Sequence, residues 1–371
     1  WNDALDMAKE RGESVAFTTI YGDNLRAMAE LLLALKKREG ISGIDVPAEL
    51  LSLIKFDASG LGDVSKMQEA LKAYCESVRH TVSGKKIAVD IEDLATSLKE
   101  KADWVKKHIL ENEVVTDGKG NEWINGYYDN SGRQVEGNDR MMLTGQVFAI
   151  MSGTAPDDLV GKIAKSADTY LYDVAAGGYR LNTDFKEIKT DMGRMFGFAY
   201  GTKENGAVFS HMTTMYANAL YQRGFAKEGY KAFYTLASHC LDTEKSKIYP
   251  GVPEYIDPKG RGLYHYLTGA ASWLLMTVVT EMFGVKGTLG DLTFAPKLLA
   301  CQFDNEGKAS VSLDFAGRHI KVTYVNAAKA EYGAYSIKSI CMNGKTYEGV
   351  IPRADIVALD EGATHDIVVN L

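Results

Sequence analysis

The sequence lacks an excess of basic charge and has no long apolar run. Its 371 residues include 42 lysines and arginines against 49 aspartates and glutamates, which gives a formal charge of −7 at pH 7. Binding to phosphate backbones relies on clustered Lys and Arg, so this balance argues against a nucleic-acid partner. The nearest candidate for a membrane span, ASWLLMTVVTEMFGV, is interrupted by Glu281 and falls short of the roughly 18 apolar residues that a span requires. We expect no membrane segment.

Cysteine is scarce as well, and the usual cofactor signatures are missing. The few cysteines are far apart and form no CxxC pair, which predicts reduced, mostly buried thiols in a reducing, cytoplasmic compartment. The seven histidines have no metal-ligand spacing, so we expect no metal site. HExxH, GxSxG, the P-loop pattern and a GxGxxG after a strand are absent, which disfavours the enzyme classes that use them. The cysteines are Cys75, Cys240, Cys301 and Cys341.

The chain up to about residue 287 has the pattern of a helical protein. Apolar residues recur at helical spacing in several stretches, many of them bounded by Gly, Asp or Pro. These stretches are 14–38, 63–79, 89–111, 156–172, 206–223, 226–241 and 265–283. Long aromatic and Gly-rich loops connect them, and such loops usually carry function. The rhythm is typical of helical hairpins arranged around an axis.

Beyond residue 287 the pattern changes to short alternating strands. KASVSLDF, RHIKVTYVN and HDIVVNL alternate apolar and polar residues, and Asn343-Gly344 marks a hairpin turn. We therefore expect two domains, a helical one at 1–287 and a small β-domain at 288–371.

The sequence opens with WND, which places Asp3 next to an aromatic residue. By residue type alone, Asn2 or Asp3 is an N-cap for a short helix over ALDMAKER. The neighbouring Trp1 favours a different interpretation, because an apolar wall raises the pKa of a carboxylic acid, as a general acid at neutral pH requires. Trp1 also offers a flat face for a sugar ring.

Two further stretches combine donors suited to an anion. His211 lies inside a helical pattern in KENGAVFSHMTTMY, after a glycine and small residues that could form a helix entry, and an imidazole with a helix N-terminus makes an anion site. Thr268-Gly269 precedes a long apolar helix and offers a hydroxyl with unobstructed N–H groups. The structural alternatives are a core or capping histidine for the first and a tight helix-packing point for the second.

A fourth stretch, YPGVPEYIDPKGRG, places Glu254 in a Pro- and Gly-rich loop among tyrosines. Carboxylates accept hydrogen bonds from sugar hydroxyls and aromatic rings stack on sugar faces, so this composition is typical of sugar recognition. A solvated loop glutamate is the ordinary alternative.

Taken together, these stretches resemble the inverting glycoside phosphorylases of the cellobiose, cellodextrin and chitobiose phosphorylase family, glycoside hydrolase family 94. The matching segments follow the family's order along nearly the whole chain, which is far more specific than any one of them. They are WND (1–3), GES (12–14), NGYYDNSG (125–132), RMMLTGQVFAIMSG (140–153), KENGAVFSH (203–211), GVPEYI (251–256) and YHYLTGAASW (264–273).

The resemblance implies a mainly α fold. Residues 1–287 would form the C-terminal part of an (α/α)6-barrel catalytic domain, and residues 288–371 a small β-sandwich or jelly-roll-like domain. The implied roles are general acid for Asp3, phosphate binding for His211, Thr268 and Gly269, and sugar binding for Trp1 and Glu254.

The implied reaction is the reversible phosphorolysis of a β-glucosidic bond with inversion. An inverting glycosidase needs two carboxylates, one of them a base that activates water. Phosphate is already a charged nucleophile, so a single acid suffices and α-glucose 1-phosphate is the product. No cofactor is expected, because phosphate is a substrate. A β-gluco-oligosaccharide is the expected partner, and the family suggests a homodimer.

Family members also use an arginine and donor-sugar ligands that lie upstream of the WND motif. The given sequence has no such region, so we expect a fragment that is inactive or very weak by itself. The residues of the segments WNDALDMAKERGES and NGYYDNSGRQVEG favour the cellodextrin-type branch, with β-1,3- and β-1,2-linked substrates as alternatives. An (α/α)6 hydrolase of the glucoamylase type and a non-catalytic carbohydrate-binding fragment stay open as other functions.

Overall fold

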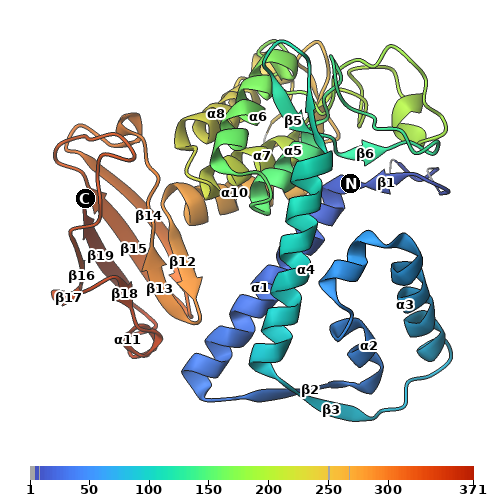
Figure 1. Cartoon of the computed structure of the whole chain (residues 1–371). Coiled ribbons are helices and arrows are strands. Elements are labelled where there is room, and N and C mark those ends of the chain that lie inside the picture. Colours follow the sequence, from blue (N-terminus) through green and yellow to red (C-terminus); the bar gives the residue numbers. More distant parts are fainter. Residues whose placement is uncertain (1–4, 8, 250, 267) are drawn as a thin grey trace. The chain divides into compact units, whose positions relative to one another are not determined.

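A computed structural model describes residues 5–7, 9–249, 251–266 and 268–371. The chain divides into two compact units. The N-terminal unit comprises residues 1–166 and 187–197, and the C-terminal unit comprises residues 167–186 and 198–371. In the described part, helices hold more residues than strands and the sheets are small (Figure 1). The predominance of helix agrees with the sequence prediction, whereas the barrel and the β-sandwich stay predictions.

Two long helices, α1 (Val15–Glu39) and α4 (Ile91–Asn112), pack along each other in the N-terminal unit (Figure 1). Ser14 caps α1 by accepting a hydrogen bond from the N–H of Phe17 at 3.2 Å. A Cβ atom on Gly22 would lie 2.8 Å from Cγ1 of Val105, so the glycine permits close approach of the two helices. The predicted stretches 14–38 and 89–111 cover both helices except for the last residue of each, because each helix has a side-chain cap and apolar residues at helical spacing.

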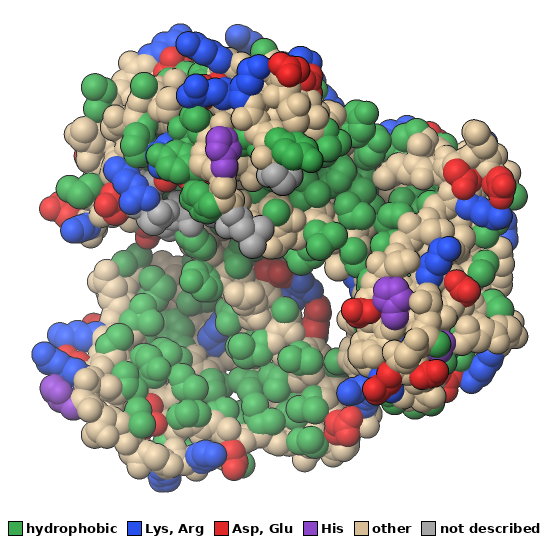
Figure 2. Space-filling model, turned by 180° about the vertical axis from the view of Figure 1, so that it is seen from behind, with side chains coloured by type: hydrophobic (Ala, Val, Ile, Leu, Met, Phe, Trp, Pro, Cys, Tyr) green, Lys and Arg blue, Asp and Glu red, His purple; other side chains and the backbone are tan. Residues whose placement is uncertain are grey.

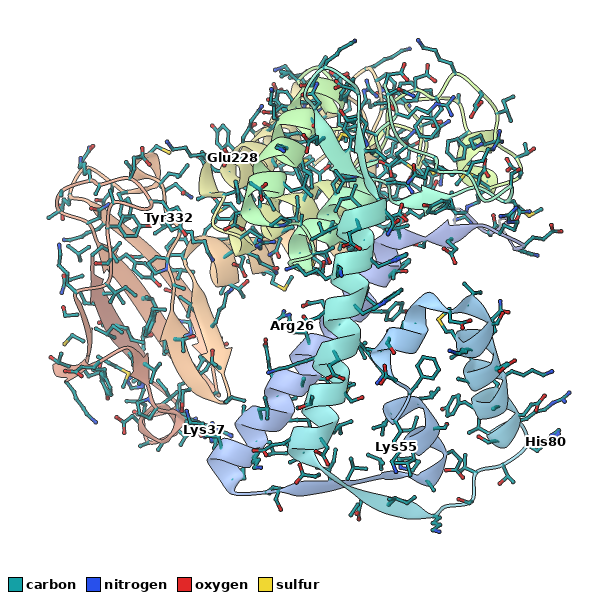
Figure 3. All side chains as sticks on the ribbon, in the orientation of Figure 1. Arg26, Lys37, Lys55, His80, Glu228 and Tyr332 are labelled. Carbon is teal, nitrogen blue, oxygen red and sulfur yellow. The ribbon has the colours of Figure 1, made fainter. Side chains whose placement is uncertain are left out.

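A lobe follows α1 and leads into α4. Strands β2 (Gly43–Pro47) and β3 (Lys86–Asp90) pair antiparallel, and α2 (Leu51–Ile54) and α3 (Val64–Ser77) lie between them in sequence. Figure 3 labels Lys55 and His80 in this lobe and Arg26 and Lys37 along α1. The sequence predicted α3 but missed the ribbon, because each strand is only five residues long and largely exposed.

Helix α5 (Leu143–Met151) was also missed by the periodicity analysis. Eight of its nine residues are buried, so the helix has no polar face to create a helical period. The remaining elements that begin in this unit are β1 (Glu13–Ser14), β4 (Val114–Thr116), β5 (Glu122–Ile124), β6 (Tyr127–Tyr128) and α6 (Asp157–Tyr170), with 3₁₀ turns at Ala48–Leu50, Ala58–Gly62 and Arg194–Gly197.

The short helix expected over ALDMAKER is not formed in the described residues. Residues 5–7 and 9–12 adopt bends, turns and irregular structure. The N–H of Met7 donates to the carbonyl of Met192 at 3.2 Å, and the N–H groups of Glu10 and Arg11 donate to Oδ1 of Asn130. These backbone N–H groups are thus paired with residues far away in the sequence, which satisfies them without the hydrogen bonds of a local helix.

The C-terminal unit contains α7 (Ser210–Gln222), α8 (Ala226–Leu241) and α10 (Gly269–Met276), and α7 packs against both of the others. A π-helical turn (Thr277–Met282) continues α10. The helix predicted at 265–283 is therefore present, but it begins at Gly269, four residues after the predicted start. The smaller elements are β7 (Tyr172–Asp173), β8 (Gly178–Tyr179), β9 (Val208–Phe209), α9 (Thr243–Ser246), β10 (Tyr255–Ile256) and β11 (Gly262–Leu263).

The last part of the chain forms two sheets, as the alternating pattern predicts. One has the order β12-β13-β18 and the other β14-β15-β19-β16-β17, in which β15 and β19 are parallel. Their buried face shares a core with Tyr221 of α7 and Ala226 of α8. The boundary at 287/288 stays a prediction. The elements are β12 (Val285–Thr288), β13 (Asp291–Phe294), a 3₁₀ turn (Ala300–Gln302), β14 (Lys308–Phe315), β15 (Arg318–Val325), β16 (Ser339–Met342), β17 (Lys345–Tyr347), β18 (Val350–Ile351), α11 (Arg353–Val357) and β19 (Thr364–Asn370).

Apolar side chains are exposed on part of the surface. In Figure 2 hydrophobic side chains gather in the lower part of the face seen from behind. On α1, the exposed apolar residues include Tyr21, Met28 and Leu31. Among the described residues, no helix combines the length and apolar character that crossing a membrane requires.

Candidate active site

The starts of helices α7 and α10 meet in the C-terminal unit. His211 is the second residue of α7, and Gly269 is the first residue of α10. A Cβ atom on Gly269 would lie 2.7 Å from Cε1 and 2.9 Å from Nε2 of His211, so the imidazole packs directly on the glycine backbone. Thr268, which precedes Gly269, is the N-cap of α10. The structure therefore brings together the three predicted phosphate-site residues.

A small antiparallel sheet brings the starts of α7 and α10 together. Strand β10 pairs with β9, which leads into α7, and with β11, which precedes α10. Glu254 stands just before β10, and its carbonyl accepts a hydrogen bond from the N–H of Ser210 at 3.0 Å. The predicted sugar-binding residue is thus tied to the first residue of α7.

The electrostatics of this corner favour an anion. The first N–H groups of a helix have no partner within the helix, and the aligned peptide dipoles add positive charge there. Burial lowers the pKa of His211, which keeps the imidazole neutral and able to donate one N–H. The Thr268 hydroxyl accepts from the N–H of Ala270 at 3.2 Å, which leaves its own hydrogen available as a donor.

Ser210 adds a further polar atom at the start of α7. Its side chain is fully buried, and in the described part of the chain its hydroxyl has no hydrogen-bond partner. Buried polar atoms are normally satisfied, so an unpartnered hydroxyl beside His211 is typical of a functional region.

Glu254 belongs to a cluster with two tyrosines and a lysine. The Tyr266 hydroxyl donates to its carboxylate. Nζ of Lys203 lies 4.1 Å from the centre of the Tyr264 ring, and the rings of Tyr264 and Tyr266 lie 6.3 Å apart, edge to face. The tyrosines are about half exposed. The cluster offers aromatic faces, one cation and one carboxylate, which together suit a polyhydroxylated ligand.

The sequence analysis did not single out Lys203, Tyr264 or Tyr266. Both Lys203 and Tyr264 have positive φ, at 47° and 61°, which is strained for residues other than glycine and is concentrated at functional sites. The available signal was the pair of tyrosines around one residue in YHY, next to the predicted Thr268-Gly269 site.

The predicted catalytic residue Asp3 and the predicted sugar-binding residue Trp1 lie outside the described residues. The chain that follows them, from Leu5 onward, belongs to the N-terminal unit. A cavity of about 110 Å³ borders this segment. It is lined by Leu5, Gly12, Glu13, Ser14, Tyr127, Tyr128 and Met192.

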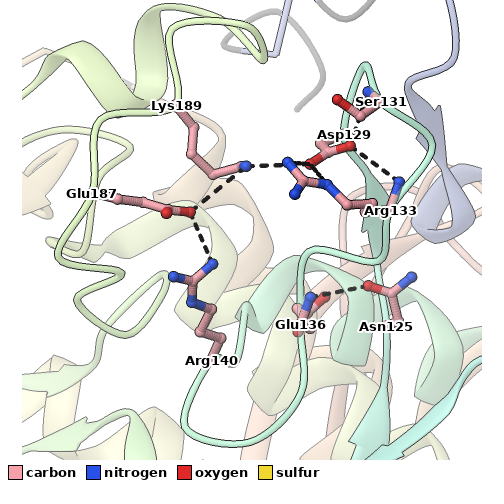
Figure 4. Close-up of polar contacts among 8 residues, drawn as sticks. All are labelled: Asn125, Asp129, Ser131, Arg133, Glu136, Arg140, Glu187 and Lys189. Atoms are coloured by element: carbon pink, nitrogen blue, oxygen red, sulfur yellow. Dashed lines mark hydrogen bonds and ion pairs between the residues drawn. The ribbon is translucent and has the colours of Figure 1, made fainter.

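A second cavity of the N-terminal unit, of about 180 Å³, is lined by alternating charges. Nζ of Lys189 lies 3.4 Å from Asp129 and 3.6 Å from Glu187, and Arg140 contacts Glu187 at 2.9 Å (Figure 4). Burial alone would raise the pKa of Asp129, but the N–H groups of Arg133 and Ser131 and the Lys189 ammonium outweigh it and lower that pKa. Asp129 is therefore a carboxylate at neutral pH.

Comparison with known proteins gives the context for both regions. The family model described as "Glycosyl hydrolase 94 superfamily, catalytic domain" matches residues 82–284, which is more than half of the chain. The chain belongs to this superfamily. The match includes the starts of α7 and α10 and the Asp129–Lys189 cluster, and it confirms the family to which the sequence motifs pointed.

Several characterised relatives are named phosphorylases. The chain is 23% identical to a solabiose phosphorylase of Paenibacillus borealis over 82% of its length and 38% of that protein's. It is 24% identical to a cellobionic acid phosphorylase of Neurospora crassa, over 75% of the chain and 35% of the relative. It is also 24% identical to an N,N'-diacetylchitobiose phosphorylase of Vibrio proteolyticus, over 64% and 30%. The chain thus spans about a third of the length of these relatives.

Proposed function

We propose that this superfamily member is an inverting glycoside phosphorylase. Phosphate would cleave a β-glucosidic bond of a gluco-oligosaccharide and give α-glucose 1-phosphate and a shortened sugar, reversibly. The observation that best supports this proposal is the contact between His211 and Gly269 at the starts of two helices. Helix N-termini and an imidazole N–H are complementary to a phosphate, whereas a hydrolase that activates water has no use for an anion site.

In the proposed mechanism Asp3 acts as the general acid. It protonates the departing glycosidic oxygen while phosphate attacks the anomeric carbon from the opposite face, which inverts the configuration. General acid catalysis of this kind contributes roughly 10²–10⁴-fold. The phosphate supplies its own negative charge as the nucleophile, so no catalytic base takes part.

The phosphate ligands position the nucleophile and offset its charge. His211 donates one N–H, Thr268 donates its hydroxyl, and Gly269 leaves the N-terminal backbone of α10 open to close approach. Donors fixed before the reaction need no reorganisation when charge moves from phosphate to the leaving group. On this proposal Glu254 and Trp1 border the sugar subsites.

For the substrate we propose a cellodextrin, on the basis of the WNDALDMAKERGES and NGYYDNSGRQVEG segments. The relatives' names include different disaccharides, so the linkage is the part of the proposal that the test must decide. Phosphate is consumed as a substrate, no cofactor takes part, and the enzyme acts as a cytoplasmic homodimer.

The test follows sugar release by the full-length protein with and without inorganic phosphate. Cello-oligosaccharides and β-1,3- and β-1,2-linked glucans serve as substrates, and glucose 1-phosphate and free glucose are measured separately. We expect phosphate-dependent release of α-glucose 1-phosphate, abolished in Asp3→Asn, with a raised KM for phosphate in His211→Gln. His319→Gln is the matched control, because His319 lies on β15 and pairs with Asp314.

Release of free glucose without phosphate would identify a hydrolase and overturn the phosphate-site assignments. Phosphate-dependent cleavage of another linkage would retain the phosphorylase and replace the cellodextrin. Sugar binding without turnover on any substrate would support a carbohydrate-binding protein instead.

A further inference from the structure

The segment that follows Asp3 in sequence is held by two loops of the N-terminal unit. The first is the loop at 187–197. The N–H of Met7 donates to the carbonyl of Met192 at 3.2 Å, and the N–H of Arg194 donates to the carboxylate of Asp6 at 3.4 Å. These contacts hold the Asp6 side chain and the Met7 backbone, three and four residues after Asp3.

The second loop is the turn at 129–133. Oδ1 of Asn130 accepts from the N–H of Glu10 at 2.8 Å and from the N–H of Arg11 at 3.1 Å. A Cβ atom on Gly132 would lie 2.9 Å from Cζ of Arg11, so the guanidinium packs on the turn itself. Immediately beyond, β1 pairs with β6. The segment from Asp6 to Ser14 is therefore bonded at both of its ends.

Asp129 builds the turn that presents Asn130. Its carboxylate accepts from the N–H groups of Ser131 at 2.9 Å and Arg133 at 3.0 Å, and its carbonyl accepts from Gly132. The Asp129 side chain is 3% exposed. A buried carboxylate with these bonds sets one conformation of the turn.

Lys189 joins the two loops. Its ammonium bridges Asp129 of the turn and Glu187 of the other loop, and its side chain is only 10% exposed. Arg140 holds Glu187 from the opposite side at 2.9 Å (Figure 4). Removing Lys189 would take the ammonium away from the buried Asp129, which keeps only the Arg133 guanidinium, at 3.2 Å from Asp129 on the same turn, and would leave the two loops without this link.

We propose that Lys189 is a positioning residue for the general acid: it braces the two loops that hold the segment directly following Asp3. This inference rests on the proposed function. Lys189 touches neither phosphate nor sugar in this role. It acts through the backbone of residues 6–11, and an error of about 1 Å in the placement of a catalytic group costs on the order of 10²-fold in rate.

The test compares substrates with different leaving groups, which separates a misplaced general acid from a general loss of folding or activity. Protonation matters for a sugar leaving group, whereas dinitrophenolate departs without a proton. In Lys189→Met of the full-length protein we expect kcat for oligosaccharide phosphorolysis to fall by about 10- to 100-fold. Phosphorolysis of a dinitrophenyl β-glucoside should fall by less than about threefold. Asp3→Asn should give the same pattern in stronger form.

Three variants complete the experiment. Lys189→Arg retains the charge and should restore most of the oligosaccharide activity. Lys162→Met removes a half-exposed lysine that pairs with Glu122 at 2.9 Å, and should leave both reactions unchanged. Asn130→Ala, which removes the acceptor for Glu10 and Arg11, should reproduce the leaving-group pattern of Lys189→Met.

The outcomes distinguish this inference from the proposed function. A wild-type protein without phosphate-dependent cleavage overturns the proposed function. An active wild type whose Lys189→Met variant loses neither reaction, or loses both equally while keeping the wild-type unfolding temperature, overturns the positioning role alone. Unfolding temperatures measured for every variant identify a loss of both reactions that comes from misfolding, and Asn130→Ala then decides the case.

Discussion

The imidazole of His211 rests on the backbone of Gly269, with a distance of 2.7 Å between Cε1 and the place where a Cβ atom would stand. The contact joins the first turn of α7 to the first residue of α10. It leaves no room for a side chain at position 269. The glycine is therefore required by the histidine, whose ring packs against the start of α10.

Gly269→Ala should displace the imidazole and weaken phosphate binding. We expect the KM for phosphate to rise by about tenfold or more, with a smaller change in kcat, because a misplaced ligand loses its hydrogen bond to the substrate. Steady-state kinetics over a range of phosphate concentrations measure this. Gly197→Ala is the control, because a Cβ atom there meets open space. An unchanged KM in Gly269→Ala would contradict the phosphate role of His211.

Thr268→Val should remove both the cap of α10 and a phosphate donor. The hydroxyl accepts from the N–H of Ala270 at 3.2 Å, and loss of such a cap costs about 1 kcal/mol of unfolding free energy. Thr268→Ser keeps the hydroxyl and should preserve stability and phosphate KM. If Val and Ser behave alike in denaturant unfolding and in kinetics, the hydroxyl has neither role.

Glu281→Ala should strongly destabilise the protein. Its carboxylate is 3% exposed and lies 2.6 Å from Lys286 and 3.0 Å from Lys297, whose side chain is itself 12% exposed. Breaking a buried pair leaves an uncompensated charge, at a cost of about 3 kcal/mol or more. Glu306→Ala, which removes an exposed pair with Lys308, should change the unfolding free energy by less than about 1 kcal/mol. If denaturant unfolding gives the same loss of unfolding free energy for both variants, the buried pair is no more important for stability than the exposed one.

Stability should depend on pH through Glu136. Burial raises the pKa of this carboxyl to about 8 from an ordinary 4.5, although the N–H groups of Met142 and Gly126 favour the carboxylate. The folded protein then binds more protons than the unfolded chain between these values. The contribution is full below about pH 4.5 and is lost as the pH rises through about 8.

Glu136→Gln removes this titration. Between about pH 5 and about pH 8, the unfolding free energy of the wild type should fall relative to that of the variant. Denaturant unfolding at several pH values measures the difference. A difference that is constant with pH, or that grows in favour of the wild type, would show that Glu136 keeps an ordinary pKa in the folded protein.

The sequence by itself determined the local elements and the family. Helices α1, α4 and α8 follow from apolar periodicity, which side-chain caps reinforce in α1 and α4. Strands β14, β15 and β19 follow from alternation, and both signals depend on near neighbours in the chain. The ordered motifs identified the superfamily, which the family model confirms. The sequence did not predict α5, because its nearly uniform burial leaves no helical period. It also did not predict the β2–β3 ribbon, because both strands are short and largely exposed.

Only the tertiary structure decided how distant residues combine. His211 and Gly269 were separate candidates in the sequence, and the pairing of β9, β10 and β11 brings them into contact. The segment after Asp3 does not form the expected helix, because Asn130 and Met192 accept hydrogen bonds from its backbone N–H groups. No local pattern predicts that Lys189 binds Asp129, since the energy of such a contact depends on burial and on residues far apart in the chain.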